Sequence, residues 1–309
     1  MKTLDVSIII VNWNTRDILR DCLRSVYDQT RDITFEVILI DNASADGSAE
    51  MVRNEFPQVI LIANQQNRGF ATANNQGMKI AQGRYVLLLN PDTIILEEAI
   101  QKSVAFADSH VSAGVVGIKT FYSDGTLQPN CYQFASIPNL LISTIGLNKL
   151  LPRSRLWGRE RYTWWNYDTI REVDVVTGCF MLVRQEVLEK VGMMDESYFI
   201  YGEEMDWCWR IKQKGWNVLF YPHARFIHYG RMSSAQNPIN MMKEARRSFL
   251  RFIEKRQGKL MKYPALFLLL CGGVARLIYW VLHWCTTWKN KRSYIQKKIR
   301  ESYNRCIGN

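Results

Sequence analysis

The chain lacks the cysteine spacing of a zinc knuckle or of a disulfide framework. Its seven cysteines are odd in number, and no two stand in a Cys-x-x-Cys arrangement. Scattered cysteines of this kind suit a reducing cytosolic environment, where disulfides rarely persist. A signal peptide is also lacking, because the first residues pass directly into a strand-like apolar run. We therefore expect that the protein is not exported by that route.

The first 240 residues have no excess of positive charge. The whole chain carries 40 Lys and Arg against 29 Asp and Glu, a net charge of +11. Residues 241–309 hold 16 of the basic and 3 of the acidic residues, which leaves 24 against 26 for the rest. Basicity confined to a tail argues against a nucleic-acid-binding protein, and we expect no nucleic-acid partner.

The tail has the composition of a membrane-surface anchor. Residues 263–288 are mostly apolar and aromatic, with basic residues on both sides: Lys255, Arg256, Lys259 and Lys262 before, and Lys289, Lys291 and Arg292 after. Basic residues attract an anionic leaflet, and Tyr and Trp favour the headgroup level. On a helix, Arg276, Trp280, His283, Trp284 and Trp288 lie to one side, and Leu277, Ile278, Val281 and Leu282 to the other. This layout favours a helix in the interface, with a spanning helix and an ordinary buried helix as alternatives.

The first 120 residues alternate between apolar runs and helix-like segments, with no internal repeat or low-complexity linker. The runs are residues 5–11, 35–40, 59–63 and 85–89, and the helix-like segments are 16–27, 48–56 and 70–81. Repetition of this kind predicts a mostly parallel sheet with helices on both faces. Each run ends in polar or small residues, and we expect these ends to form one crevice.

The second half is less regular. Ser123-Asp124-Gly125-Thr126 predicts a hairpin turn within residues 119–135. Residues 136–167 are irregular and rich in Trp, Arg and Leu, which suits a variable insert that contacts substrate. The rest predicts a strand over 173–183, helices over 185–191 and from about 203, and short strands over 217–221 and 224–228.

The run Tyr85 to Leu89 is followed at once by Asn90, Pro91 and Asp92. The run is apolar enough for a central strand, and the proline prevents its extension because it has no N–H to donate. Asp92 at the carboxyl end of such a strand can hold a cation against phosphate oxygens. The alternative is that Asp92 caps a helix that starts just after it.

Glu203, Glu204 and Asp206 form an acidic group at the start of the helix expected from about residue 203. Acidic residues in a first turn complement the helix dipole, which is the structural alternative. The residues just before the group, Tyr198 to Tyr201, are apolar and aromatic, which favours a role as a general base instead. Desolvation beside such a wall raises a carboxylate's proton affinity, and a base held there can take a proton from a sugar hydroxyl.

His228 ends the strand-like run Arg225-Phe226-Ile227. A lone histidine at a strand end is either a structural residue or a ligand, and the sequence alone does not separate the two. His223 follows Pro222 in a turn and ranks below His228 as a candidate. After the first strand, Asn12-Trp13-Asn14-Thr15-Arg16 lacks the glycine-rich, Lys-bearing loop of a nucleotidyltransferase.

Seven segments together resemble family 2 glycosyltransferases, and within them the rhamnosyltransferase-like branch that builds bacterial cell-envelope polysaccharides. The resemblance covers residues 5–235, and its specificity lies in the order and spacing of the motifs. They are Ile8 to Asn14, Ile40 to Ser44, Asn67 to Ala71, Asn74 to Gly77, Leu88 to Asp92, Gly178 to Leu182 and Tyr201 to Asp206.

The resemblance implies a GT-A fold, a nucleotide-sugar donor, a divalent cation, Mg²⁺ or Mn²⁺, and inversion at the anomeric carbon. It places Asn12 and Asp41 at the nucleoside, Asn42, Arg68 and Asn75 in donor-site loops, and Asn90 beside them. Asp92 matches the last acid of the family's metal motif and His228 a metal-binding histidine. Glu204 occupies the position of the general base.

Two departures from the family pattern affect the site. Asn90 stands where many relatives have the first Asp of the metal motif, which leaves less negative charge for a cation. Glu204 stands where Asp is common in the branch, so Glu203 and Asp206 stay open as alternative or supporting bases.

The resulting expectation is an α/β enzyme with a GT-A domain over residues 1–235 and a basic amphipathic helical tail over 236–309. Residues 1–120 are expected to bind the nucleotide sugar and 121–235 to carry the acceptor and catalytic half. The resemblance favours L-rhamnose from dTDP-rhamnose, with UDP-hexose donors or a non-catalytic nucleotide-sugar-binding protein as alternatives. A lipid-linked saccharide is the expected acceptor, at the cytoplasmic face of the bacterial inner membrane.

Overall fold

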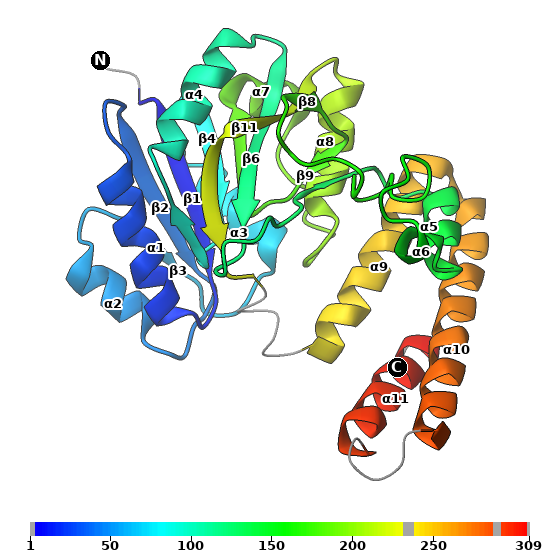
Figure 1. Ribbon diagram of the computed structural model, residues 1–309. Coiled ribbons are helices and arrows are strands. Elements are labelled where there is room, and N and C mark those ends of the chain that lie inside the picture. Colours follow the sequence, from blue (N-terminus) through cyan, green and yellow to red (C-terminus); the bar gives the residue numbers. More distant parts are fainter. Residues whose placement is uncertain (1–3, 231–237, 287–291, 308–309) are drawn as a thin grey trace. The chain divides into compact units, whose positions relative to one another are not determined.

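The structure is a computed structural model that describes residues 4–230, 238–286 and 292–307. The chain forms two compact units (Figure 1). Unit 1 comprises Met1–Phe134 and Trp165–Gln236, and unit 2 comprises Ala135–Trp164 and Asn237–Asn309. The expected domain boundary at residue 235 stays a prediction; in this grouping, residues 135–164 are separated from the rest of the expected first domain. They group with the C-terminal helices.

Unit 1 is built on a nine-stranded sheet with the order β3-β2-β1-β4-β10-β6-β11-β5, and β8 also pairs with β11. Strands β1, β2, β3 and β4 are mutually parallel, and β10 runs antiparallel between β4 and β6. The strands are β1 Val6–Asn12, β2 Phe35–Asp41, β3 Ile60–Ala63, β4 Tyr85–Leu89, β5 Thr93–Ile95, β6 Ala113–Phe121, β8 Arg171–Glu172, β10 Phe180–Arg184 and β11 Asn217–His228. A separate two-stranded sheet pairs β7 Cys131–Tyr132 with β9 Val175–Val176.

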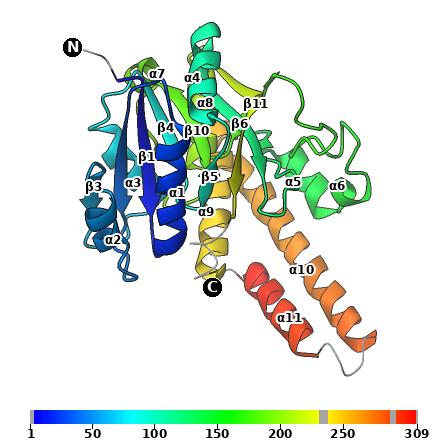
Figure 2. The same cartoon turned by 60° about the vertical axis from the view of Figure 1, so that its left-hand side comes forward.

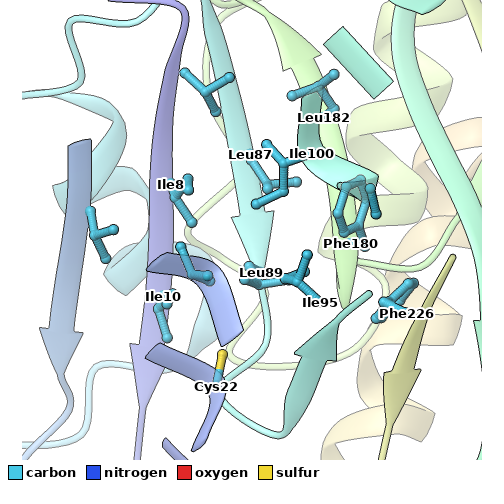
Figure 3. Close-up of a cluster of buried hydrophobic side chains, with 14 of the residues drawn as sticks. Ile8, Ile10, Cys22, Leu87, Leu89, Ile95, Ile100, Phe180, Leu182 and Phe226 are labelled. Atoms are coloured by element: carbon cyan, nitrogen blue, oxygen red, sulfur yellow. The ribbon is translucent and has the colours of Figure 1, made fainter. Parts of the chain in front are cut away.

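Helices cover both faces of this sheet, as the alternating pattern predicts. The helices of unit 1 are α1 Arg16–Gln29, α2 Ser48–Glu55, α3 Phe70–Met78, α4 Ala99–Ser109, α7 Gln185–Val191 and α8 Glu203–Gln213. The core under α1, α2 and α4 is made of alternate strand residues such as Ile8, Leu87 and Phe180 (Figure 3). On the other face, a side chain at Gly77 of α3 would meet Ile9, so this glycine lets the helix lie directly on β1.

Several elements differ from the sequence expectation. The strand expected over 173–183 is two strands, β9 and β10, because the chain breaks at Thr177-Gly178-Cys179 and changes sheet. The two strands expected over 217–228 are one, β11, with an irregular register between Tyr221 and Arg225. The turn at Ser123 to Thr126 forms as expected, with Tyr122 N donating to Thr126 O at 2.8 Å.

Unit 2 is helical, as expected for the tail. Its elements are α5 Ile137–Thr144, α6 Leu147–Leu150, α9 Pro238–Gln257, a short 3₁₀ turn Lys259–Met261, α10 Lys262–Thr286 and α11 Arg292–Ile307. The segment Lys259–His283 is long and apolar enough to cross a membrane by length and composition. The residues Trp288, Lys289 and Lys291, and the side chains of Trp284 and Arg292, lie outside what the structure describes.

Candidate functional site

The sheet topology brings the predicted polar strand ends to one edge. β1, β2 and β4 are parallel, so Asn12, Asp41 and Asn90 lie at or just beyond the same ends of neighbouring strands. β6 runs antiparallel to β10, which itself runs antiparallel to β4, and β11 is parallel to β6. β11 therefore points the same way as β4, and its last residue, His228, reaches the same edge.

Asp92 and His228 form a pair at this edge. Asp92 Oδ1 lies 3.3 Å from His228 Nε2, and Tyr229 N donates to the Asp92 carbonyl at 2.9 Å. β5 and β11 set this geometry, because their antiparallel register places Thr93 opposite His228. The helix-cap alternative for Asp92 is wrong, since Thr93 begins a strand and the next helix starts only at Ala99.

Gln128, which sequence reasoning missed, fixes the orientation of His228. Its Oε1 lies 2.7 Å from His228 Nδ1, and its Nε2 donates to the His228 carbonyl at 3.3 Å. An amide oxygen only accepts, so Nδ1 carries a proton, and Nε2 is the ring nitrogen that faces Asp92. Asn90 Nδ2 lies 3.3 Å from that same nitrogen.

The donor set of this pair fits a divalent cation. Carboxylate oxygen and neutral imidazole nitrogen are both ligands of Mn²⁺, and a hydrogen bond to the far ring nitrogen is the usual support for a ligating histidine. Asp92 and His228 are only two such groups. In the described segments of the chain, no cluster of three or more His, Cys, Asp or Glu residues is placed to hold a metal ion.

Asn12 and Asp41 are joined in a buried network at the ends of β1 and β2. Asn12 Nδ2 donates to Asp41 Oδ1 at 3.0 Å and to Ser44 Oγ at 3.0 Å, and Thr15 Oγ1 donates to Asn12 Oδ1 at 2.6 Å. The second oxygen of Asp41 accepts from Ser44 N at 3.0 Å. This network holds the Asp41 carboxylate rigidly at the strand end where a nucleoside is expected.

Asn42 is buried and organises the loop before α3. Its Oδ1 accepts from Arg68 N at 3.0 Å and from Asn64 Nδ2 at 3.1 Å, and its Nδ2 donates to Asn67 Oδ1 at 2.9 Å. The oxygen and the nitrogen of its amide are therefore both engaged within the protein. The structure gives Asn42 a loop-positioning role, and its predicted contact with the donor stays a prediction.

Asn75, on α3, also has a positioning role. Its Nδ2 donates to Met194 O at 2.9 Å and to Glu196 Oε1 at 3.0 Å, and its Oδ1 accepts from Met194 N at 3.1 Å. It thereby fastens residues 194–196, more than a hundred positions away in the sequence, to α3. Its place in the donor site also stays a prediction.

Arg68 is a basic residue of the loop before α3, and its predicted contact with the donor stays a prediction. Its backbone is held by Asn42, whereas its side chain is exposed, and no carboxylate pairs with its guanidinium among the residues the structure describes. An exposed arginine on a fixed backbone is well suited to bind phosphate.

Glu203 and Glu204 are the first two residues of α8, and each affects the pKa of the other. Burial raises the pKa of Glu203 well above the usual value, and the neighbouring Glu204 charge raises it further. Burial also raises the pKa of Glu204, although hydrogen bonds from Gly202 N and Glu203 counter this rise. The larger rise in pKa is that of Glu203, so of the two carboxyls Glu203 is the one that more readily keeps a proton. The role of Glu204 as the base stays a prediction.

Asp206 anchors α8. It is fully buried, and its Oδ2 accepts from Arg210 Nε at 2.8 Å. The same guanidinium donates to the carbonyls of Val191 and Met193 at 3.2 and 2.8 Å. A carboxylate engaged in this way has a structural task, so among the three acids expected as bases the geometry favours the Glu203–Glu204 pair.

A backbone hydrogen bond joins the start of α3 to the segment that precedes α8. Phe70 N donates to Phe199 O at 2.7 Å, and a Cβ on Gly69 would lie 2.5 Å from that carbonyl. Gly69 has a φ of +81°, so glycine is required here by both conformation and space. Tyr201 and Gly202, with φ values of +65° and +93°, then turn the chain into α8.

Comparison with known proteins bears on the family and the fold. Residues 7–192 match the family model described as Glycosyl transferase family 2. The chain is 26% identical over 246 residues to the N-acetylglucosaminyl-diphospho-decaprenol L-rhamnosyltransferase of Mycobacterium tuberculosis, which spans 74% of this chain and 77% of that protein. It is 26% identical over 226 residues to the low-salt glycan biosynthesis hexosyltransferase Agl10 of Haloferax volcanii, covering 69% and 64% of the two.

Solved structures show the same fold at low identity. The mannosyltransferase PcManGT of Pyrobaculum calidifontis, in complex with GDP-Man and Mn²⁺, superposes with a TM-score of 0.58 at 15% identity, covering 98% of this chain and 86% of that one. GalNAc-T7 with UDP, GalNAc and Mn²⁺ gives a TM-score of 0.57 at 16% identity, covering 82% and 48%. The predicted GT-A fold is confirmed.

Proposed function

The chain belongs to glycosyl transferase family 2, and we propose that it moves a sugar from a nucleotide-sugar donor to a lipid-linked saccharide with inversion at the anomeric carbon. The observation that carries this proposal is the Asp92–His228 pair, in which Nε2 of the histidine lies 3.3 Å from a carboxylate oxygen. It lies at the sheet edge that also carries Asn12 and Asp41.

The proposed donor is dTDP-L-rhamnose. The carboxylate of Asp41, fixed by Asn12 and Ser44, can accept the N–H of a pyrimidine base. Preference for rhamnose rests on the similarity to the mycobacterial L-rhamnosyltransferase. A UDP-hexose carries the same pyrimidine N–H and diphosphate, so it is the second candidate.

In the proposed reaction, Glu204 takes the proton of the acceptor hydroxyl as that oxygen attacks the anomeric carbon from the face opposite the leaving diphosphate. No covalent intermediate forms. Arg68 would bind a donor phosphate, and Asp92 and His228 would hold Mg²⁺ or Mn²⁺. That cation, when bound, neutralises charge on the diphosphate.

The proposed acceptor lies at the cytoplasmic face of the bacterial inner membrane. The mycobacterial relative is named for a diphospho-decaprenol acceptor, and the candidate span Lys259–His283 supports a peripheral or monotopic attachment of this chain. The excess of basic residues after position 240 supports contact with an anionic surface.

A panel of nucleotide sugars with Mn²⁺ tests the donor, because a ligand that binds the native state raises its melting temperature. We expect one base and one sugar to stand out.

Transfer is then measured with Glu204→Gln, which keeps the size of the side chain and removes its basicity. We expect that this variant binds donor like the parent but loses transfer; appreciable residual turnover rejects Glu204 as the base.

A non-catalytic nucleotide-sugar-binding protein is the competing function. Asn90 favours it, because the site then has one carboxylate fewer than many relatives for a cation. It predicts donor binding without turnover at any Mn²⁺ concentration, whereas the proposed enzyme shows turnover that saturates with Mn²⁺.

A further inference from the structure

Unit 2 exposes large apolar side chains from two segments that are far apart in the sequence. In the insert, Ile145, Leu150 and Leu156 are 59%, 73% and 52% exposed. On α10, Phe267, Ile278 and Leu282 are 65%, 53% and 61% exposed. Exposed apolar residues on this scale mark a surface that is covered by a partner.

The two segments are packed together within unit 2. Helix α5 lies against α10. Gly272, near the middle of α10, is buried, and a Cβ there would stand 3.4 Å from Thr144 Cγ2 at the end of α5. That is an ordinary van der Waals distance, so the end of α5 lies directly against the middle of α10, and the insert and α10 form one body.

This body carries the chain's excess of positive over negative charge. Residues 135–164 and 237–309 hold 21 of the 40 basic residues but only 4 of the 29 acidic ones, a net charge of +17. Unit 1 has 19 against 25, a net charge of −6. The apolar side chains of unit 2 thus stand among basic residues.

We propose that residues 135–164 and α10 form a single membrane-binding surface, and that α10 lies in the interface of an anionic bilayer rather than across it. This deepens the proposed function, on whose membrane-bound acceptor it rests. It assigns the insert, expected at first to contact substrate, to the membrane.

The packing around α10 argues against a span. A spanning α10 would have its middle, near Gly272, at the bilayer centre. The insert packed there includes an irregular backbone with Arg153 and Arg155, and irregular backbone does not occur against lipid in the hydrocarbon core. Helix α11 also packs along α10 (Figure 2) and carries Lys297 and Lys298, which would enter the core with it.

An anionic bilayer suits this surface better than a second copy of the chain. Two units of +17 repel each other, whereas the same charge attracts an anionic leaflet. The C-terminal half of α10 also has an aromatic cluster, in which the His283 ring lies 5.9 Å from Tyr279 and 5.7 Å from Trp280. Such amphipathic rings favour the headgroup level.

Co-sedimentation of the full chain with phosphatidylcholine vesicles, with and without phosphatidylglycerol, tests the surface. We expect binding that needs the anionic lipid and weakens with salt. Leu150→Glu should lower the partition coefficient about tenfold, because an inserted apolar side chain is replaced by a charge that the surface repels. The matched control is Val111→Glu in unit 1, where the side chain is 78% exposed and binding should not change.

The orientation of α10 is tested separately, with reporters fused to the C-terminus in bacterial cells. An interfacial α10 keeps a fluorescent-protein fusion bright and an alkaline phosphatase fusion inactive. Phosphatase activity overturns the interfacial placement, unchanged binding of Leu150→Glu overturns the role given to the insert, and equal binding to neutral vesicles overturns the anionic partner. None of these measurements uses donor or acceptor, so a failure of sugar transfer is distinguishable from a failure of membrane binding.

Discussion

Gln128 is expected to control metal binding without touching the metal. Its Oε1 accepts a hydrogen bond from His228 Nδ1 at 2.7 Å, and its Nε2 donates to the His228 carbonyl at 3.3 Å. These two contacts keep the proton on Nδ1 and fix the direction of the ring. In Gln128→Leu the acceptor is lost. The ring can then protonate at Nε2, the nitrogen that faces Asp92, and that form cannot bind a cation.

The size of the effect follows from the kind of contact. Loss of a partner that orients a ligating side chain typically lowers metal affinity about 10- to 100-fold. That range corresponds to about 1.4–2.8 kcal/mol of binding free energy. Only one of the two protein ligands is affected, since Asp92 is placed by the pairing of β5 with β11.

The assay is titration of Mn²⁺ in the presence of a nucleoside diphosphate, with free Mn²⁺ read by electron paramagnetic resonance. Gln128→Glu, which keeps an acceptor at the same place, should restore most of the affinity. Nitrogen chemical shifts of His228 report the tautomer directly. A Gln128→Leu protein that melts like the parent and binds Mn²⁺ equally well would refute the argument.

The remaining predictions concern the Glu203–Glu204 pair and Gly69, the residue before α3. Because burial raises the pKa of Glu204, the acidic limb of the kcat/KM profile should lie above the ordinary glutamate value of about 4.5. Glu203→Leu should move that limb to still higher pH, since it removes a hydrogen bond that lowers the pKa of Glu204. A limb that stays in place contradicts the pairing. Gly69→Ala should lower the melting temperature more than Gly125→Ala, because both have φ near +80° but only Gly69 would press a Cβ against the Phe199 carbonyl, 2.5 Å away. If both variants lower the melting temperature equally, the positive φ alone sets the cost, and the contact with the Phe199 carbonyl adds nothing.

The sheet and its functional edge could be predicted because both depend on local patterns. Continuous apolar runs indicated central strands, and parallel strands bring their ends to one side. That reasoning placed Asp92 at the functional edge, whereas the role expected of Asp41 came from the family resemblance. Glu203 was found from its place at a helix start, although its burial against Glu204 could not be seen in the sequence.

The features that could not be predicted depend on contacts between distant segments. Gln128 lies in an irregular stretch after a turn, a hundred positions before His228, and nothing in its neighbourhood distinguishes it. The insertion of β10 between β4 and β6 likewise follows from no local pattern. The insert 135–164 groups with α10 through a glycine contact, and an apolar helix does not reveal which segment will pack on it.

The charge of the metal site suggests how donor and cation reach it. Asp92 is the one carboxylate of the pair, and His228 and Asn90 add only an imidazole and a neutral amide beside it. A divalent cation on these groups alone keeps a positive charge beside a largely buried wall, which is unfavourable in a low dielectric. A donor diphosphate supplies the missing negative charge, and Arg68, on a backbone fixed by Asn42, is placed to bind it. Cation and donor therefore stabilise each other in the site, and each is expected to bind weakly without the other.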